Sequence, residues 1–402
     1  CGVWGIFALG DLPALYATTA PESTAPATLA PQPAAVVNGM LECPTGFALD
    51  GLGRRVPVGW ILARADGDPV INSARHQFSG ACENDGGHVE KMEGRDSLVI
   101  RARDLETPPA PGKPFDVVLY QQVPVAPDGD YSVSGWMLSL CGGSAVPSDC
   151  PEGVYIRKAI GLDPTGGIDP RSSAIVWTEN LDNFVTRDQV RVGWANLSVG
   201  ARAQSSVMTV FLRVHSPFQW HGNHAFIDAI ELHRAPVAWF VNLPRAVNPG
   251  RRITVRWDSF QSPEIAAIPG GTYGVLVDVQ VRTRVAAGGS PGAWQDLVQN
   301  GSTQGECQFT VGGAGQAVEF RLRARAEQPP PPALGAWPLQ RFPGPWSAPH
   351  TMTVRTLAAA MEAGMGNSIP DGGVMLAQNR QGLPALYLPT LGSNHTGSHG
   401  GC

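Results

Sequence analysis

Four histidines lie close together around a single tryptophan, and they are the first candidates for chemistry. They are His215, His221, His224 and His233, with Trp220 between them. None has the His-x-x-x-His spacing that places two imidazoles on one face of a zinc-binding helix. The surrounding residues predict a hairpin, so we interpret these histidines as residues of a turn.

Acidic residues are the second candidates, because hydrolysis of a glycosidic bond requires two carboxylates about 5 to 10 Å apart across a cleft. Those available in the middle of the chain are Glu152, Asp163, Asp169 and Glu179. Most of them occur in segments typical of turns, where such residues form local hydrogen bonds. The sequence also has no Gly-x-Ser-x-Gly, phosphate-loop or dinucleotide motif. These patterns favour a protein that is not an enzyme.

Aromatic residues indicate sugar binding, because their faces stack on sugar rings while neighbouring polar groups bind the hydroxyls. In the segment 131–137, alternation places Ser132, Ser134 and Trp136 on one polar face. We therefore expect Trp136 to be exposed or to line a groove. The expected groove residues are Trp136, Tyr155, Arg157, Trp177 and Trp220. We expect Trp60 to fill the core instead.

The composition favours an all-β protein. The chain has 402 residues, of which 43% are hydrophobic and 16% are charged, and it contains 48 glycines and 36 prolines. Such a composition gives frequent turns and few long helices. The net charge of -5 provides no positive surplus for nucleic acid or an anionic membrane, and we expect neither partner. No stretch reaches the 18 to 20 or so apolar residues of a transmembrane segment.

Short strands separated by turns are predicted through the middle of the chain. They cover residues 115–120, 131–137, 207–214, 252–257, 275–282 and 318–325. In the last strand, Val318 and Phe320 alternate with Glu319 and Arg321, which is typical of a half-buried antiparallel strand. Turns are predicted at 127–130 and 163–167. A helix is predicted at 356–364, but it is too short to be stable unless it packs on something else.

The two ends of the chain differ from the middle. Residues 17–36 are rich in Ala, Thr and Pro and are predicted to be an extended linker. The segments before and after the strands are apolar, and both contain Leu-Pro-Ala-Leu-Tyr. Their main apolar residues are Val3, Trp4, Ile6, Phe7, Leu9, Leu12, Leu15, Tyr16, Leu383, Leu386 and Tyr387.

Exposing such side chains costs roughly 25 cal/mol per Å² of apolar surface, so we expect them to be buried. Addition of a terminal segment to a neighbour's sheet edge would bury it and build a homopolymer. The alternatives are that both tails fold back on their own domains, or that the first dozen residues are a membrane-proximal remnant. The sequence begins with Cys1 rather than Met, which indicates removal of a secretory signal. A lipid on Cys1 is an alternative role for that residue.

The seven cysteines lack the CxxC and Cys-His spacings of a zinc site, so we interpret them as disulfides of an exported protein. Cys141 and Cys150 enclose a short loop and are predicted to pair. Cys43 and Cys82 are the next expected pair. This leaves Cys1, Cys307 and Cys402, and an intermolecular bond through Cys1 or Cys402 is one alternative to inert thiols.

Residues 36–235 resemble the jelly-roll carbohydrate-binding modules of the family 4/9/16/22 type. The resemblance depends on Asn38-Gly-Met-Leu-Glu42, Val56-Pro-Val-Gly-Trp60, the strands 119–125 and 131–136, and the closing strand 226–232. It implies a structural calcium ion with Glu42 and Asp228 among its oxygen ligands. Ala229 replaces a second Asp that is common in the family, which weakens that expectation.

Residues 237–354 look like a fibronectin type III domain, an immunoglobulin-like β-sandwich. The segments that carry this resemblance are 277–282, 293–297, 320–325 and Pro345-Trp-Ser-Ala-Pro349. The predicted divisions are an assembly segment 1–16, a linker 17–36, a jelly-roll domain 37–236, a fibronectin-like domain 237–355 and an extension 356–402.

The sequence therefore predicts an extracellular, non-catalytic structural subunit that polymerises into a surface filament or sheath. The alternative is a surface-anchored protein that binds a polysaccharide in the jelly-roll groove. Three Asn-x-Ser/Thr triplets predict N-glycosylation at Asn196, Asn300 and Asn394.

Overall fold

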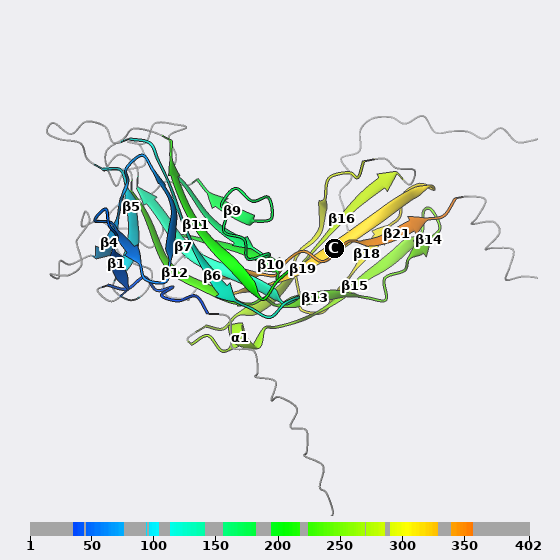
Figure 1. Cartoon of the computed structure of the whole chain (residues 1–402). Coiled ribbons are helices and arrows are strands. Elements are labelled where there is room, and N and C mark those ends of the chain that lie inside the picture. The colour runs from blue at the N-terminus through cyan, green and yellow to red at the C-terminus, as the bar shows by residue number, and fades with distance from the viewer. Residues whose placement is uncertain are drawn as a thin grey trace, which may run out of the picture. The chain divides into compact units, whose positions relative to one another are not determined.

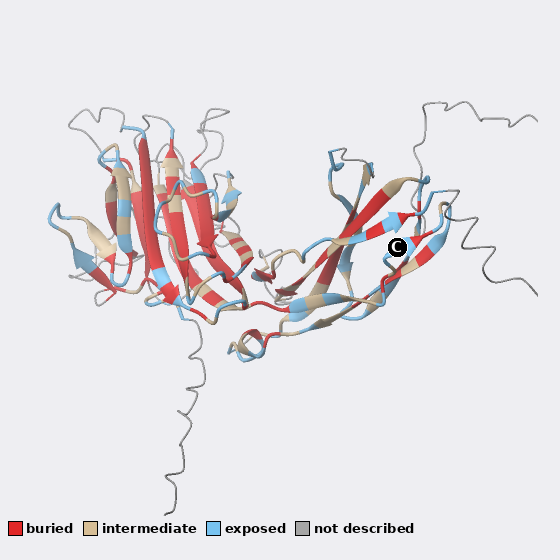
Figure 2. Cartoon of the chain, turned by 45° about the vertical axis from the view of Figure 1, so that its right-hand side comes forward, coloured by how far each residue is buried: buried red, intermediate tan, exposed pale blue. Residues whose placement is uncertain are grey.

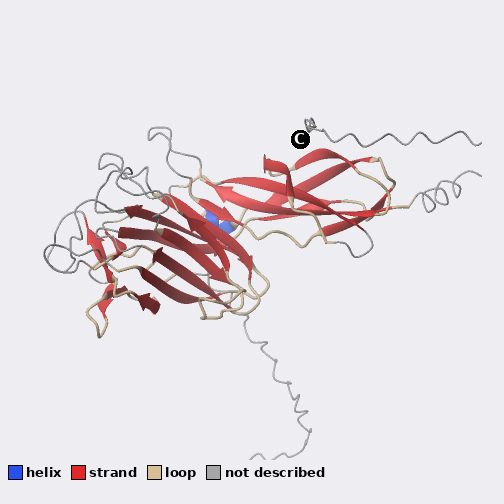
Figure 3. Ribbon diagram, turned by 90° about the horizontal axis from the view of Figure 1, so that it is seen from above, coloured by secondary structure: helices blue, strands red, loops and turns tan. Residues whose placement is uncertain are grey.

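The chain is built almost entirely from β-strands. The computed structural model describes residues 35–43, 46–75, 94, 96–103, 113–140, 156–181, 194–217, 224–269, 271–285, 290–328 and 339–356. These residues form strands β1 to β21 and one short helix, α1 (Figure 1; Figure 3). The all-β prediction is confirmed. Within these ranges no helix has the length and apolar character needed to cross a bilayer.

The first sandwich contains two five-stranded antiparallel sheets. One sheet has the order β10-β7-β12-β5-β4, and the other has the order β3-β6-β11-β8-β9. The first comprises β4 (Val70–Arg75), β5 (Asp96–Arg101), β7 (Asp130–Leu140), β10 (Ala195–Arg202) and β12 (His224–Arg234). The second comprises β3 (Ile61–Asp66), β6 (Phe115–Pro124), β8 (Arg157–Asp163), β9 (Val176–Asn180) and β11 (Val207–Ser216). A hairpin of β1 (Phe47–Leu49) and β2 (Arg55–Pro57) accompanies them.

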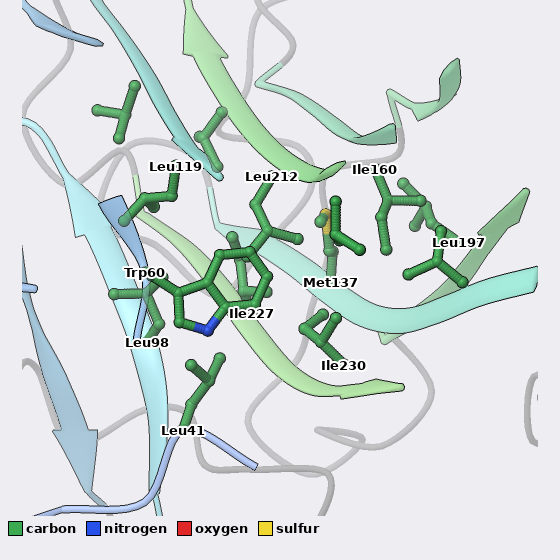
Figure 4. Packing of buried hydrophobic residues seen from close by; sticks show 14 of the residues in the cluster. Leu41, Trp60, Leu98, Leu119, Met137, Ile160, Leu197, Leu212, Ile227 and Ile230 are labelled. Atoms are coloured by element: carbon green, nitrogen blue, oxygen red, sulfur yellow. The ribbon is translucent and has the colours of Figure 1, made fainter. Parts of the chain in front are cut away.

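The inner faces of these two sheets share one apolar core. Alternate residues of each strand point inward, so Met137 and Ile227 of one sheet join Leu119 and Leu212 of the other in one cluster (Figure 4). Trp60 is 5% exposed and lies within this core, as expected. The predicted strands 115–120, 131–137 and 207–214 all lie within longer strands of the sandwich.

The second sandwich has a three-stranded sheet in the order β13-β15-β18 and a larger sheet in the order β14-β21-β19-β16-β17, to which β20 adds beside β19. The strands are β13 (Val237–Val241), β14 (Ala246–Val247), β15 (Arg252–Phe260), β16 (Gly274–Val285), β17 (Gln295–Gly301), β18 (Gly305–Thr310), β19 (Gln316–Glu327), β20 (Arg341–Pro343) and β21 (His350–Val354). The helix α1 (Pro263–Ala266) was not expected from the sequence.

The second sandwich has its own apolar core. Val255 and Trp257 of one sheet pack with Val279 and Phe320 of the other. Buried residues alternate with less buried ones along parts of these strands (Figure 2). In β19 the predicted alternation holds from Phe320 onward, but Glu319 on the other face is also buried and forms an ion pair with Arg282. The predicted helix at 356–364 falls almost wholly outside the described residues, and its first residue, Thr356, is not helical.

A ladder of arginine and tryptophan covers the outer face of the larger sheet. Arg321 of β19 lies between two indoles, with its guanidinium carbon 4.3 Å from the ring centre of Trp294 and 4.5 Å from that of Trp346. Arg282 and Arg323 continue the stack at 4.3 and 4.6 Å. Each contact places a cation against an electron-rich ring face, so the ladder holds long side chains in fixed positions.

Candidate functional site

The outer face of the sheet β3-β6-β11-β8-β9 carries a row of aromatic rings. Tyr120, Phe211 and Trp177 come from β6, β11 and β9, and their neighbouring ring centres are 5.9 and 5.8 Å apart. Gly161 of β8 lies beneath the Trp177 ring. A side chain at this position would come within 2.7 Å of the indole, so the ring can lie on the strand only because residue 161 is glycine. The register therefore brings residues that are distant in sequence into one continuous surface.

The segment that joins β8 to β9 returns over this aromatic row. Asp163 accepts hydrogen bonds from the backbone N–H and the hydroxyl of Thr165 at 2.8 and 2.6 Å, which forms the predicted turn. At the other end of the segment, Ile175 packs with Tyr120 and Phe211. Phe211 is consequently buried, whereas Trp177 on the edge strand is only half-buried. Trp177 is thus the aromatic residue of the row that a ligand can reach.

Charged residues occupy the same face beside the aromatic row. Asp116 of β6 accepts hydrogen bonds from Arg213 of β11 at 2.9 Å and from Arg64 of β3 at 2.7 Å. Burial alone would raise the pKa of Asp116, but the hydrogen bonds from Arg213 and Arg64 hold this pKa below its ordinary value. Asp116 is therefore a carboxylate at neutral pH and fixes both guanidiniums in place.

A small cavity of about 120 Å³ opens next to this ion pair. Its lining consists of Arg157, Ala159, Glu179, Arg213 and His215. His215 lies between Asp116 and Arg157 across the sheet, because it is the cross-strand partner of both. Burial lowers the pKa of His215 below 6.5, with Arg213 and Arg157 acting in the same direction against Asp116. The imidazole is thus neutral at neutral pH, with one donor and one acceptor nitrogen.

One of the predicted groove residues lines this cavity, and a second lies near it. Arg157 lines it, and Trp177 lies two residues from Glu179 on the same face of β9. No described residue forms an ion pair with Arg157 or Glu179, so both remain available to a ligand. Tyr155 and Trp220 lie outside the described residues.

The expectation for Trp136 is wrong. It lies on the other sheet, is 5% exposed and packs in a second apolar cluster with Val99, Trp194 and Phe226. The alternation correctly separated Trp136 from the main core. The polar serines beside it gave no sign that this outer face is also covered.

Sequence reasoning missed most of the charged cluster. The sequence gives little sign of Asp116 or Arg213, because each is the one acidic or basic residue of a mostly apolar strand, whereas Arg64 alternates with Asp66 in β3. The turn interpretation of the histidines is wrong for His215, His224 and His233, which lie within β11 and β12. His221 lies outside the described residues.

The expected calcium ligands come from two places in the first sandwich. Asp228 is fully buried, and its carboxylate accepts the backbone N–H of Ala229 at 2.7 Å. Glu42 lies beside Gly94, and the neighbouring Cys43 donates its backbone N–H to Asp96 at 2.9 Å. In the described part of the chain, no three His, Cys, Asp or Glu residues form a group able to hold a metal. The calcium ion stays a prediction.

Two of the expected glycosylation sites are described. Asn196 uses its side-chain nitrogen to donate to the Ser134 hydroxyl at 2.8 Å and to the Gly135 carbonyl at 3.3 Å. A glycan would attach to that nitrogen and compete with these hydrogen bonds, and modification of Asn196 stays a prediction. Asn300 is exposed near the end of β17 and remains a suitable acceptor. Asn394 lies outside the described residues.

Cys43 and Cys307 are each disulfide-bonded. For Cys307 the sequence predicts no partner. The other cysteines, Cys1, Cys82, Cys141, Cys150 and Cys402, lie outside the described residues, so the expected pairings stay predictions. The expected assembly residues within 1–16 and 383–387 also lie outside them.

No family model and no curated protein matches the chain. Among solved structures, the chain is similar to that of TmCBM61 in complex with β-1,4-galactotriose, with 14% identity over 50% of this chain and 98% of that chain and a TM-score of 0.31. The K2 cleaved adhesin domain of Lys-gingipain has 14% identity over 44% of this chain and 89% of that one, with a TM-score of 0.27. The adhesin domain of Epf from Streptococcus pyogenes has 10% identity over 81% and 97%, with a TM-score of 0.25. Such low TM-scores carry no conclusion about function.

Proposed function

We propose that the chain is an extracellular, non-catalytic protein that binds a carbohydrate on the outer face of the sheet β3-β6-β11-β8-β9. The observation that carries the proposal is the half-buried Trp177 beside a cavity lined by Arg157, Glu179 and His215. Sugar sites combine an aromatic surface with polar groups that bind hydroxyls from fixed positions. Here the ion pair with Asp116 holds Arg213, which lines the cavity, in a fixed position, so this side chain loses little entropy on binding.

A glycan array probed with the full chain tests this function, followed by affinity measurements on the best ligand. Replacement of Trp177 or Arg157 by Ala should weaken binding about tenfold or more, because each removes a direct contact with the sugar. Arg202→Ala is the matched control, since Arg202 is an exposed arginine on the opposite sheet. Absence of glycan binding, or unchanged affinity in both site variants, would refute the proposal.

Polymerisation through the terminal segments is a separate proposal. Deletion of residues 1–16 distinguishes it from carbohydrate binding, because a subunit would lose assembly while a sugar-binding protein would keep its affinity. Electron microscopy of the native protein with and without reducing agent shows whether fibres form and whether disulfides hold them. Discrete particles under both conditions would contradict polymerisation.

A further inference from the structure

A second aromatic surface lies on the outer face of the three-stranded sheet β13-β15-β18. Ala238 and Phe240 of β13 pack against the core of the second sandwich, so the alternate residues Val237 and Trp239 point outward. On β15, Val255 and Trp257 belong to the same core, and the residues that alternate with them face outward. Those outward residues of β15 are Thr254, Arg256, Asp258 and Phe260.

The outward aromatic residues are unusually exposed. Trp239 is 46% exposed, Phe260 is 60% exposed and Val237 is 36% exposed. Val237 is the cross-strand partner of Phe260, and Trp239 is the partner of Asp258, so the three form one patch. A contiguous exposed apolar patch is uncommon on a soluble domain and marks a surface for contact.

Polar side chains continue directly from this patch into a depression of about 420 Å³. Its polar lining includes Arg256, Asp258, Gln304 and Glu306. Arg256 is fixed by a 2.8 Å ion pair with Glu306 of β18. Asp258 accepts the backbone N–H of Ser259 at 2.8 Å, and no described lysine or arginine forms an ion pair with it. Carboxylate, guanidinium and amide groups thus lie next to an exposed indole.

This arrangement identifies the class of occupant. A ligand must offer an apolar face to Trp239 and Phe260 and several hydroxyls to the neighbouring polar groups, as a pyranose ring does. The depression has two carboxylates and one guanidinium, so its charge disfavours an acidic saccharide. We propose that the outer face of β13-β15-β18 is a second carbohydrate-binding surface, specific for neutral polysaccharides. It is independent of the cavity at Trp177.

Affinity electrophoresis of the full chain in gels that contain neutral soluble polysaccharides tests the proposal. Suitable probes are β-1,4-galactan, arabinan, galactomannan and mixed-linkage β-glucan. Trp239→Ala should weaken retardation about tenfold, because it removes the stacking surface. Asp258→Asn should also weaken retardation, because an NH2 group replaces one of the two carboxylate oxygens that can accept a hydrogen bond from a sugar hydroxyl. Val285→Ala is the matched control, since Val285 is 60% exposed elsewhere on the second sandwich.

The variant Trp177→Ala separates the two surfaces. If the second surface binds polysaccharide, the single variant Trp177→Ala should still be retarded in the gel. The double variant Trp177→Ala/Trp239→Ala should then lose this retardation. Equal retardation of wild type and Trp239→Ala would overturn the proposal, as would loss of all retardation in Trp177→Ala alone or no retardation by any probe. Sedimentation velocity provides the remaining test: wild-type self-association that Trp239→Ala abolishes would identify a second copy as the occupant and also overturn the proposal.

Discussion

Arg213 of β11 and Asp116 of β6 lie diagonally across the two strands and join through two hydrogen bonds, each 2.9 Å long. Such two-point pairing fixes both the distance and the plane of the guanidinium. Arg213 also lines the cavity beside Trp177, so the ion pair determines where one wall of that cavity lies. The pair therefore connects the stability of the sheet to the shape of the candidate site.

Replacement of Asp116 by Asn should lower the free energy of unfolding by about 1 to 2 kcal/mol, allowing for the partial exposure of Arg213. The control is Asp130→Asn. Asp130 makes the same two-point contact with Arg202, but that arginine is more exposed, and the loss should be smaller. Urea unfolding of the three proteins measures both effects. Equal losses in the two variants would contradict the structural difference.

The Asp116 pair also predicts a pH dependence. Because the pKa of Asp116 is lower in the folded chain than its ordinary 3.8, the carboxylate stabilises the fold above that value. The stability is lost as the pH falls through the lowered pKa. The difference between wild type and Asp116→Asn should therefore narrow in acid. A constant difference down to about pH 2 would argue against the ion pair as its source.

His215 predicts a change at higher pH. Burial, Arg213 and Arg157 lower its pKa below 6.5, so the folded chain resists a proton that the unfolded chain accepts. Wild type should lose stability relative to His215→Gln as the pH falls from about 7.5 to about 5. Urea unfolding over this range measures the difference. If the stability of both proteins changed with pH in the same way, protonation of His215 would not destabilise the fold and the prediction would be wrong.

The arginine–tryptophan ladder should contribute measurably to the second sandwich. Trp346→Leu removes the indole between Arg321 and Arg323 and should cost about 1 to 2 kcal/mol. Trp239→Leu is the matched control, because Trp239 is exposed and stacks on no described arginine. Thermal unfolding compares the two variants. A similar loss in both would mean that the ladder adds nothing beyond ordinary packing.

Calcium binding is tested by thermal unfolding with added calcium or a chelator. If Glu42 and Asp228 hold the ion, calcium should raise the midpoint for wild type, and Glu42→Gln should abolish the increase. Glu306→Gln, an exposed change in the second sandwich, is the control and should keep the response. No shift with calcium in wild type would refute the predicted site.

The strand pattern could be predicted from the sequence because it depends on neighbouring residues. The alternation from Val318 to Arg325 identified β19 and its buried face correctly. The candidate site depends instead on pairing between distant strands. Asp116 and Arg157 become neighbours only because both pair with His215, and no local pattern specifies that register.

Trp136 shows a second limit of sequence reasoning. Its position on the outer face of β7 could be predicted, because alternate residues of a strand point to opposite faces. Its burial could not, since it depends on Trp194 and Phe226, which come from distant parts of the chain. Exposure of an outer face is therefore a tertiary property that a single strand does not encode.

The hydrogen bonds of Asn196 mean that its glycosylation depends on whether the first sandwich folds before or after the chain is modified. Its side-chain nitrogen becomes hydrogen-bonded to β7 once β10 pairs with that strand, whereas Asn300 stays exposed after folding. In a host that glycosylates such triplets, a glycan on Asn196 would mean that modification came first. Occupancy at Asn300 alone would mean that the first sandwich had already closed. The ratio of glycan occupancy at Asn196 to that at Asn300 therefore reports which is faster, folding or glycosylation.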